Sequence, residues 1–590
     1  MKQEKTTVLI LGAGPAGLST AVSLATAGVA CVLVERQPAD NTAVSTMPRA
    51  QRLNVRTVEI LRQLGLETAV RELAETPDKR PTMIFTTAVS APELTRFPLT
   101  HEQDEAEHSP VTHLYLTQPN LEKLLAERLD GLPNLTRYDE HEWVRVETVG
   151  EQVTAVIRPR YGGERLTIQA DYIIVADGAS HLTSELLGRE TKRAGDLPHM
   201  MTIHFRAPEL NGEPCERYWL FNKQLVGTLT PVAGQADEWV LMMPFIPPEQ
   251  KLGTLSAADC TALIRTAVND YQLTPDILNT AVWPMQAHIL ERFDLGQRIF
   301  FVGDAAHQFG LLGDLGLNMA LQGAHNLAWK LRAVCAGWAD PALLTTYDTE
   351  WRPVALLRLH NSYDHLQALF ALFGLDTADL HQIQAWMNRG STRILPHELQ
   401  EHLPVLALRR QLDKLAVLGE DSERGERRRK GIVNRVQEAG DDWFQPWGLD
   451  LGYVYESGAL LAENSPQPAG VNPLAEYVPS TWPGVRLPHV WLTRPGTDAP
   501  ISTLDLVEPD RLLLLTSNPL WAETATAVAE QLGVPLKAVV VGEKGDLQDG
   551  SGRWSVVSGI GTAGAVLVRP DGHVAWRSLR LPDTAVAAQK

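Results

Sequence analysis

The first apolar stretch of the chain changes from a strand-like to a helix-like pattern and back. Residues 8–34 carry no charged side chain and run from VLIL through a glycine-rich turn and an apolar helical stretch to ACVLV. An uncharged run of this length could span a membrane, but the glycine cluster near its start breaks the helical pattern. A buried strand, a helix and a second buried strand explain the pattern better, so we expect a βαβ unit here.

The turn between the first strand and the helix has the spacing GxGxxG. The first glycine permits a tight turn, the second lets the backbone approach a pyrophosphate, and the third lets the helix pack close to the strand. The helix N-terminus favours negative charge, and the acid that ends the second strand can accept hydrogen bonds from a ribose hydroxyl. We therefore predict a site for FAD or NAD at Gly12, Gly14, Pro15, Ala16, Gly17, Glu35 and Arg36.

The middle of the chain shows period-two patterns rich in β-branched and aromatic residues, which predict a β-sheet. The expected strands are 201–209, 216–223, 225–232 and 238–245, and a helix is expected over 256–270. Two apolar strands then flank a helical pattern in the last hundred residues, and a hairpin follows with Asp571-Gly572 as its turn. This order predicts a separate small α/β domain.

Composition narrows the class of protein. A chain of 590 residues is too long for one core, and a net charge of -18 argues against nucleic acid or an anionic membrane as partner. The basic run 424–430 reads better as a solvated linker or helix end than as a nucleic-acid patch. Four cysteines without a CxxC spacing fit a reducing cytosol and exclude a thiolate zinc site. No signal peptide is visible, so we expect a cytoplasmic protein. We also expect no metal centre.

Two further motifs carry a family resemblance. The segment MPRAQRLNVRTVEILRQLGLE (47–67) and the sequence GDAAH (303–307), which follows the apolar RIFFV, resemble the class A FAD-dependent aromatic hydroxylases. The branch that acts on phenols, chlorophenols and polyketides and carries a thioredoxin-like C-terminal domain is closest in pattern. The resemblance implies that the dinucleotide is FAD.

The resemblance assigns further FAD contacts. Arg49 would face the pyrophosphate, which agrees with the bidentate donors that a guanidinium offers a phosphate, and Gln118 would lie along the flavin. Asp304 would accept hydrogen bonds from the ribityl chain, and the helix after the loop would aim its N-terminus at the flavin pyrimidine. The remaining residues implied to contact FAD are Asp177, Gly313, Asp314, Gly316, Leu317 and Asn318. His307 reads as a structural hydrogen-bond partner rather than a base.

The chain departs from the family pattern in two places. In the segment 171–188 Asp177 and Gly178 are kept, but His181 and Ser184 stand where a serine and an arginine are expected. The missing cation puts docking of a nicotinamide phosphate by this motif in question. Asp314 replaces a glycine of the flavin loop. Either it caps the following helix, the interpretation that we favour, or its charge disfavours anionic reduced flavin and slows hydride uptake.

The resemblance also implies an architecture. We expect an α/β fold in which a Rossmann-like FAD-binding domain contains an inserted β-sheet substrate domain and precedes a thioredoxin-like α/β domain. The FAD-binding domain would comprise 1–180 and 296–420, with part of the substrate domain at about 76–112 and the rest at 181–295. A linker would follow at 421–445, and the C-terminal domain at 446–590. That domain contains no cysteine, so thiol chemistry is excluded there.

The implied activity is hydroxylation of a phenolic or polyketide-like aromatic molecule. NAD(P)H would reduce the FAD, and O2 would react through a flavin C4a-hydroperoxide. Two alternatives stay open, an atypical reaction such as oxidation or Baeyer–Villiger insertion, and a non-catalytic flavin- or substrate-binding protein. The chain would be a monomer or homodimer. No catalytic base can be named, and pocket candidates on the predicted sheet, which could equally be core or solvent-facing, are His204, Arg206, Tyr218 and Phe221.

Overall fold

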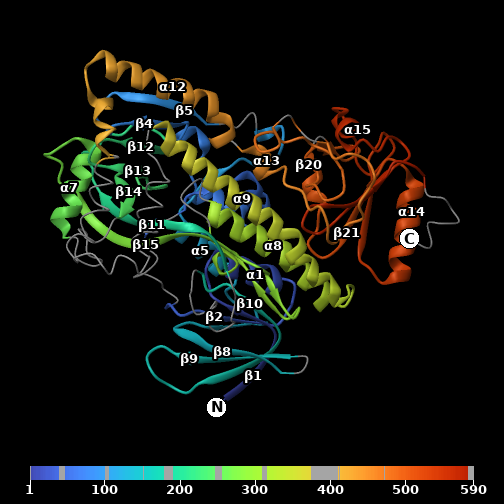
Figure 1. The fold of residues 1–590 in the computed structure, drawn as a ribbon. Coiled ribbons are helices and arrows are strands. Elements are labelled where there is room, and N and C mark those ends of the chain that lie inside the picture. Colours follow the sequence, from blue (N-terminus) through green and yellow to red (C-terminus); the bar gives the residue numbers. More distant parts are fainter. Residues whose placement is uncertain are drawn as a thin grey trace.

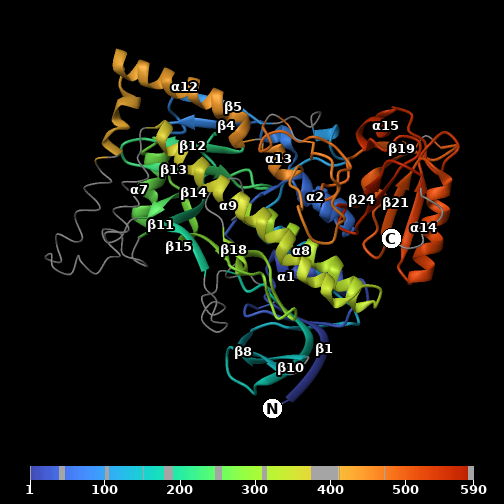
Figure 2. The ribbon, with the colours of Figure 1, turned by 45° about the vertical axis from the view of Figure 1, so that its right-hand side comes forward.

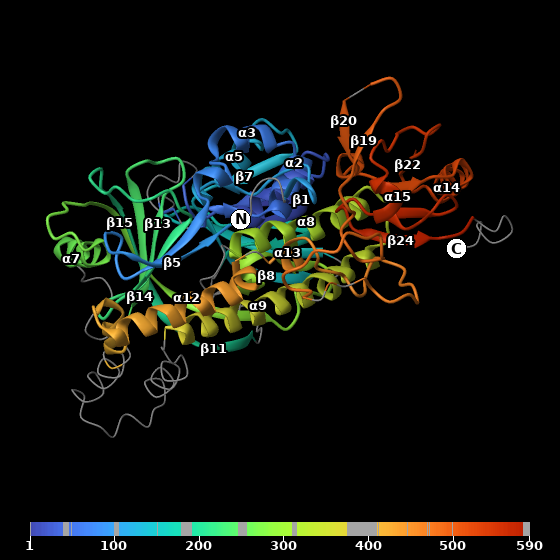
Figure 3. The same cartoon turned by 90° about the horizontal axis from the view of Figure 1, so that it is seen from above.

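The computed structural model shows three parts in a row, with a nucleotide-binding part between a large second sheet and a C-terminal domain (Figure 1, Figure 3). The residues that it describes are 2–38, 47–48, 50–99, 105–149, 152–178, 191–245, 256–308, 315–373, 410, 412–444, 446–468, 470, 472–497 and 499–581. The predicted contacts Arg49, Gly313 and Asp314, and the departures His181 and Ser184, lie outside these residues. No helix among the described residues is long and apolar enough to cross a membrane.

The predicted βαβ unit is confirmed at the centre of the first sheet. Strand β1 (Lys2–Leu11) leads into α1 (Pro15–Ala25) and β2 (Cys31–Val34), and β1 pairs in parallel with both β2 and β10 (Leu166–Val175). The strand order is β16-β17-β10-β1-β2-β7, with parallel pairing from β17 to β7 and a β8–β9 hairpin attached to β10. The other strands are β7 (Leu135–Tyr138), β8 (His141–Val149), β9 (Gln152–Pro159), β16 (Asp294–Leu295) and β17 (Ile299–Phe301).

Helices cover this sheet and bury the centre of the molecule. The longest are α8 (Leu315–Cys335) and α9 (Thr346–Leu372), which run side by side in Figure 1. Residues 8–11 of β1, strand β2 and most of α1 and α8 are buried in one apolar core. Shorter elements complete this part: α2 (Val55–Gln63), α3 (Glu67–Leu73), α5 (Gln118–Glu127) and the small ribbon of β3 (Arg52–Leu53) with β6 (Leu114–Tyr115).

The second sheet confirms the strands that the middle of the chain predicts. Its order is β18-β15-β11-β14-β13-β12-β4-β5, so two early strands join strands that follow them by more than a hundred residues. Helix α7 (Ala257–Val268) packs on one face, and the C-terminal end of α9 packs on the other. The strands are β4 (Thr82–Thr86), β5 (Glu93–Pro98), β11 (Thr191–Arg206), β12 (Arg217–Phe221), β13 (Val226–Pro231), β14 (Glu238–Phe245), β15 (Asp276–Leu290) and β18 (His307–Gln308).

The segment 421–445, for which the sequence left a solvated linker or a helix end open, contains a helix. Helix α12 (Glu423–Phe444) begins two residues into the predicted linker, and it lies along β5 at the edge of the second sheet (Figure 1). Its side chains Ile432 and Val436 are fully buried in the core that this sheet forms with the end of α9. The sequence did not reveal the length of this helix, because the basic residues occupy the exposed face of an amphipathic helix whose apolar positions are few.

The C-terminal part has the predicted α/β order. Four strands form a sheet in the order β22-β21-β23-β24, with β21 parallel to β22 and antiparallel to β23. Gly572, in the predicted Asp-Gly turn between β23 and β24, has the positive φ of +78° that such a turn requires. The elements are α13 (Trp447–Asp450), β19 (Trp491–Thr493), β20 (Pro500–Ser502), β21 (Leu512–Thr516), α14 (Pro519–Leu532), β22 (Leu536–Val540), α15 (Arg553–Ser558), β23 (Ala565–Val568) and β24 (Val574–Ser578).

Candidate active site

The GxGxxG turn makes the close contacts that its spacing predicts. Gly12 has a φ of +110°, and a Cβ at this position would lie 2.3 Å from the carbonyl oxygen of Ala176. A Cβ at Gly17 would lie 1.9 Å from the carbonyl oxygen of Gly12. At Gly14, by contrast, an added Cβ would meet no atom of the described residues within 4 Å. The described residues therefore leave space over Gly14, at the N-terminus of α1, where a pyrophosphate would be expected.

Glu35 points back at this turn from the end of β2. Its Oε2 accepts a hydrogen bond from the Ala13 N–H at 2.6 Å, and its Oε1 accepts one from the Gln37 N–H at 2.9 Å. Each carboxylate oxygen can accept a further bond, so the orientation suits ribose hydroxyl donors. Arg36 is exposed, and its carbonyl oxygen accepts a hydrogen bond from Arg160.

The GDAAH segment meets the glycine-rich turn in space. Gly303 opens a 3₁₀ turn with a φ of +59°, and a Cβ there would lie 3.0 Å from the Cβ of Ala16. Asp304 is exposed beside it, and the position of a Cβ on Gly316 lies 3.8 Å from Asp304 Oδ1. The starts of α1 and α8 and the Asp304 carboxylate thus border one region, which has the donors and the acceptor that a ribityl diphosphate needs.

The first turn of α8 contributes backbone rather than the Asn318 side chain. A helix leaves its first four N–H groups without an intrahelical acceptor, and α8 begins at Leu315, with Leu317 and Asn318 buried. The Asn318 carboxamide accepts a hydrogen bond from the Asn54 N–H at 2.9 Å and donates one to the Arg52 carbonyl oxygen at 2.9 Å. Asn318 therefore holds the segment before α2, while the N-terminus of the helix would offer positive potential to an anionic ring.

Gln118 and Asp177 occupy the predicted region in different ways. The Gln118 N–H, at the start of α5, donates to the carbonyl oxygen of Ala50 at 2.9 Å, and its side chain donates to Glu122. Gln118 is half-buried and holds the segment that follows Arg49. Asp177 Oδ2 accepts a hydrogen bond from the Trp143 indole at 3.1 Å, so this carboxylate ties the strand end to the β8–β9 hairpin. The backbone of Ala176 and Asp177 lies against Gly12 of the glycine-rich turn.

A cleft lies between the nucleotide-binding part and the second sheet and is lined by residues of both. Trp219 of β12 and Met83 of β4 form an apolar wall, and Arg52 and Asn54, which precede α2, lie in the lining with them. Leu315 of α8 also lines it. The cleft therefore reaches the start of α8, where the flavin ring is expected, and it is the substrate site that the geometry favours.

The polar lining of the cleft carries an excess of positive charge. Arg52 and Glu216 lie 3.9 Å apart, and Arg358 Nη1 lies 3.2 Å from Asp450 Oδ1. Burial opposes ionisation of Glu216, but the guanidinium groups of Arg52 and Arg217 hold its pKa below the ordinary value. The described lining holds three guanidinium groups and two carboxylates, and guanidinium groups are suited to bind a phenolate or carboxylate oxygen.

The four pocket candidates from the sequence are not among the residues that line this cleft. His204 and Arg206 do share one strand face, as predicted, but Nε2 of His204 and Nη2 of Arg206 each lie 2.8 Å from the Glu238 carboxylate. Tyr218 points to the α7 side, where its hydroxyl bonds the Glu213 backbone. The Phe221 ring stacks on Phe373 with centroids 3.4 Å apart. In the structure these side chains pack and form ion pairs, and a part for them in substrate binding stays a prediction.

Sequence reasoning had little signal for the residues that do line the cleft. Trp219 was visible as an aromatic strand residue, and its alternation with Tyr218 places it on the opposite face of β12. Arg52, Arg358 and Asp450 come from three segments without a shared motif. Only the packing of α9 against the second sheet, together with the contacts of α13 to α9 and to Asn54, brings them together.

His307 is a structural residue, as predicted. Its side chain is fully buried, and Nε2 accepts a hydrogen bond from the Trp351 indole at 3.3 Å. Burial lowers the pKa of His307 to about 3, so the imidazole is neutral at physiological pH and suited to accept this bond.

These features define an FAD-binding flavoprotein, since the cradle fits a ribityl diphosphate and the cleft adjoins the helix that would face the flavin. The model of an FAD binding domain matches residues 5–362, and that of the C-terminal domain of aromatic-ring hydroxylases matches residues 480–589. The chain belongs to the family of FAD-dependent aromatic-ring hydroxylases and is a flavoprotein monooxygenase.

Relatives match along nearly the whole chain. A protein of Streptomyces halstedii named as a polyketide hydroxylase is 32% identical over 97% of this chain and 93% of its own length. The 4-methyl-5-nitrocatechol 5-monooxygenase of a Burkholderia species is 31% identical over 98% and 95%. Among solved structures, the flavin-dependent monooxygenase PieE in complex with FAD and substrate is 30% identical, with a TM-score of 0.84 and coverage of 100% and 98%.

Proposed function

We propose that the chain hydroxylates a phenolic or polyketide-like aromatic molecule held in the cleft, with NAD(P)H as reductant and O2 as oxidant. The observation that carries this is the position of the cleft, which lies between the Trp219 wall and Arg52–Asn54 and reaches Leu315 at the start of α8. The names of the relatives, which include polyketide, nitrocatechol and phenol substrates, support an aromatic substrate.

The residues at the cradle would hold FAD by charge and hydrogen bonds. The N-terminus of α1 over Gly14 would bind the pyrophosphate, Glu35 the ribose, and Asp304 the ribityl hydroxyls. Backbone N–H groups at the start of α8 would face the pyrimidine edge, where they favour negative charge. FAD, when bound, supplies the redox chemistry, namely acceptance of a hydride and activation of O2.

The cleft would orient the substrate and exclude water. Met83 and Trp219 offer an apolar and aromatic surface for a ring system, and both are buried. Arg217 and Arg52 would bind a phenolic oxygen and favour its anionic form, which makes the adjacent ring carbons more electron-rich. The ring would then lie between the second sheet and the start of α8.

The altered segment after Asp177 motivates the alternatives of an atypical reaction and of a flavin-binding protein that NAD(P)H does not reduce. Anaerobic addition of NADPH, then NADH, to the purified yellow protein separates these from the hydroxylase. We expect bleaching of the flavin absorbance at about 450 nm, a property of the cofactor itself, and faster bleaching with a phenolic substrate. A band that stays unchanged with both nucleotides, with and without aromatic molecules, would contradict hydroxylation driven by NAD(P)H.

A further inference from the structure

Helix α8 is buried along most of its length, yet one of its faces is polar. Asn318, Gln322, Asn326 and Lys330 follow at intervals of four residues, and their side chains are 0–2% exposed. Residues four apart stand above one another on a helix, so the four form one row, which we call the polar stripe. It extends roughly 18 Å along the helix axis. Burial of such side chains is unfavourable unless they are hydrogen-bonded, so their partners explain why the stripe is there.

The first half of the stripe holds the segment before α2. Asn318 bonds the Asn54 N–H and the Arg52 carbonyl oxygen, each at 2.9 Å. One turn further, Gln322 Nε2 donates to Asn54 Oδ1 at 3.2 Å and to Thr57 Oγ1 at 3.3 Å. Asn54 Oδ1 also caps α2 by accepting from the Thr57 N–H. This half of the stripe therefore fixes both the cleft residues Arg52 and Asn54 and the start of α2.

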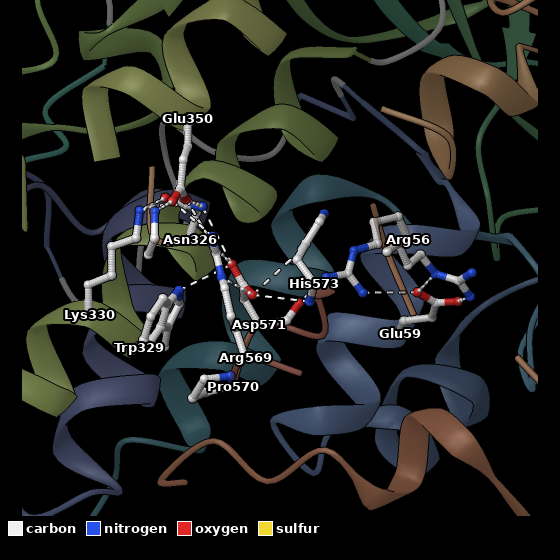
Figure 4. Close-up of polar contacts among 12 residues, drawn as sticks. Arg56, Glu59, Asn326, Trp329, Lys330, Glu350, Arg569, Pro570, Asp571 and His573 are labelled. Carbon is white, nitrogen blue, oxygen red and sulfur yellow. Dashed lines mark hydrogen bonds and ion pairs between the residues drawn. The ribbon is translucent and has the colours of Figure 1, made fainter. Parts of the chain in front are cut away.

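The second half of the stripe ends on a carboxylate that the C-terminal domain shares. Lys330 Nζ and Asn326 Nδ2 lie 2.7 and 2.8 Å from Glu350 Oε2 of α9 (Figure 4). Arg569, at the end of β23, donates to both oxygens of Glu350 at 2.8 and 2.9 Å. Arg569 also pairs with Asp571, whose Oδ2 accepts from the Trp329 indole of α8 at 3.1 Å.

The same hairpin turn holds α2 directly. Arg56, in the first turn of α2, donates from Nη2 to the Asp571 carbonyl oxygen at 2.6 Å and pairs with Glu59 at 3.0 Å (Figure 4). Arg486 of the C-terminal domain binds both oxygens of the Glu59 carboxylate, and shares Oε2 with Arg56. Figure 2 shows the C-terminal sheet beside α2 with this hairpin nearest to it. One turn of the C-terminal domain thus contacts both helices whose first turns border the cleft.

We infer that the Asp571–Gly572 turn and the polar stripe set the positions of the first turns of α2 and α8. The C-terminal domain therefore helps to position the residues of the flavin and substrate site. The identity of the ligands at that site rests on the proposed function. Asn326, Lys330, Glu350, Arg569 and Asp571 act from a distance as positioning residues. Every link in the row is a buried hydrogen bond, so loss of one link leaves a buried polar group that the helices must move to satisfy.

Two substitutions in the stripe test this in the full-length protein. Asn326→Leu is nearly isosteric and breaks the link to Glu350, while Gln322→Met breaks the link to Asn54 and Thr57. The matched control is Arg62→Met, which removes an ion pair of α2 with Asp505 of the C-terminal domain but contacts no stripe residue. Trp329→Phe, which removes the indole donor to Asp571 and keeps an aromatic ring beside Arg569, is the milder variant if Asn326→Leu does not fold.

Hydrogen exchange of the backbone amides in 52–58 and 315–322 is the first measurement, because it needs no turnover. We expect exchange in both segments to become between about 2-fold and 30-fold faster in the stripe variants and to be unchanged in Arg62→Met. The flavin spectrum and the rate of anaerobic reduction should change in the same variants. Exchange equal to wild type in Asn326→Leu and Trp329→Phe would overturn the inference. Failure of the wild type itself to be reduced would count only against the proposed function.

Discussion

The backbone N–H of Asn54 donates a hydrogen bond of 2.9 Å to Oδ1 of Asn318, across 264 residues of sequence. This bond joins the start of α2 to the start of α8. Each helix follows a segment that the family resemblance connects with FAD, one through Arg49 and the other through Asp304. The two segments are hydrogen-bonded to each other, so a substitution in one should shift the position of the other.

Loss of the Asn318 carboxamide should weaken cofactor binding. Asn318→Leu leaves the Asn54 N–H and the Arg52 carbonyl oxygen buried without this partner, at a cost of about 1–3 kcal/mol for each group. We expect the Kd for FAD, measured by quenching of flavin fluorescence, to rise by about 10-fold or more. The control is Asn134→Leu, which removes two similar bonds to the carbonyl oxygens of Ala25 and Val29, at the opposite end of α1 from Gly14. An equal rise in both variants would show a general loss of stability instead.

Two glycine substitutions should separate folding from cofactor binding. Gly14→Ala places its Cβ in open space with an ordinary φ of -74°, so the apoprotein should keep its stability to within about 0.5 kcal/mol and lose FAD. Gly12→Ala meets the Ala176 carbonyl oxygen at 2.3 Å with a φ of +110°, so it should lower the melting temperature as well. Thermal denaturation and the flavin content of the purified protein measure both effects. A Gly14→Ala protein that retains a full complement of FAD would place the pyrophosphate elsewhere.

Two surfaces are candidates for the substrate site, the cleft and the strand face that carries His204, and substitutions in each should affect substrate binding differently. Arg217→Met removes a buried guanidinium from the cleft, and a hydrogen bond to a charged group contributes about 1.5–3 kcal/mol. We therefore expect KM for a phenolic substrate to rise by about 10-fold or more while the flavin spectrum stays unchanged. Arg206→Met, which breaks the ion pair with Glu238, should leave KM unaltered. Steady-state kinetics with both variants decides between the two surfaces, and the reverse pattern would restore the strand face as the substrate site.

Stability should fall in mild acid because His307 is buried in its neutral form. Its pKa is about 3 in the folded chain against 6.5 for an ordinary histidine, so the unfolded chain binds the extra proton first. The contribution of neutral, buried His307 to the free energy of unfolding is complete above pH 6.5, and it is lost progressively as the pH falls toward 3. At pH 5 the loss is about 2 kcal/mol. Urea unfolding at pH 7 and pH 5 should show a smaller drop for His307→Gln than for wild type, and equal drops would mean that His307 is already charged when folded.

Some expectations from the sequence were confirmed because they rest on neighbouring residues. The βαβ unit needs only the order of its apolar runs and the spacing of three glycines, and the Asp571-Gly572 hairpin needs only its turn residues and flanking strands. The linker prediction was different, since a charged stretch gives the same pattern in a solvated linker and on the exposed side of α12. The few buried positions of α12, such as Ile432 and Val436, could be recognised as core residues only once the helix was seen to pack along β5.

The nucleotide-binding class and the family follow from motifs that depend on local spacing along the chain. Which side chains meet at the cleft, and what the C-terminal domain touches, depends on tertiary packing. Arg52, Arg217 and Arg358 share no period or motif, and neither do Lys330, Glu350 and Arg569. Their meeting depends on how helices and sheets pack, and a buried charge is tolerated only where that packing supplies its partner.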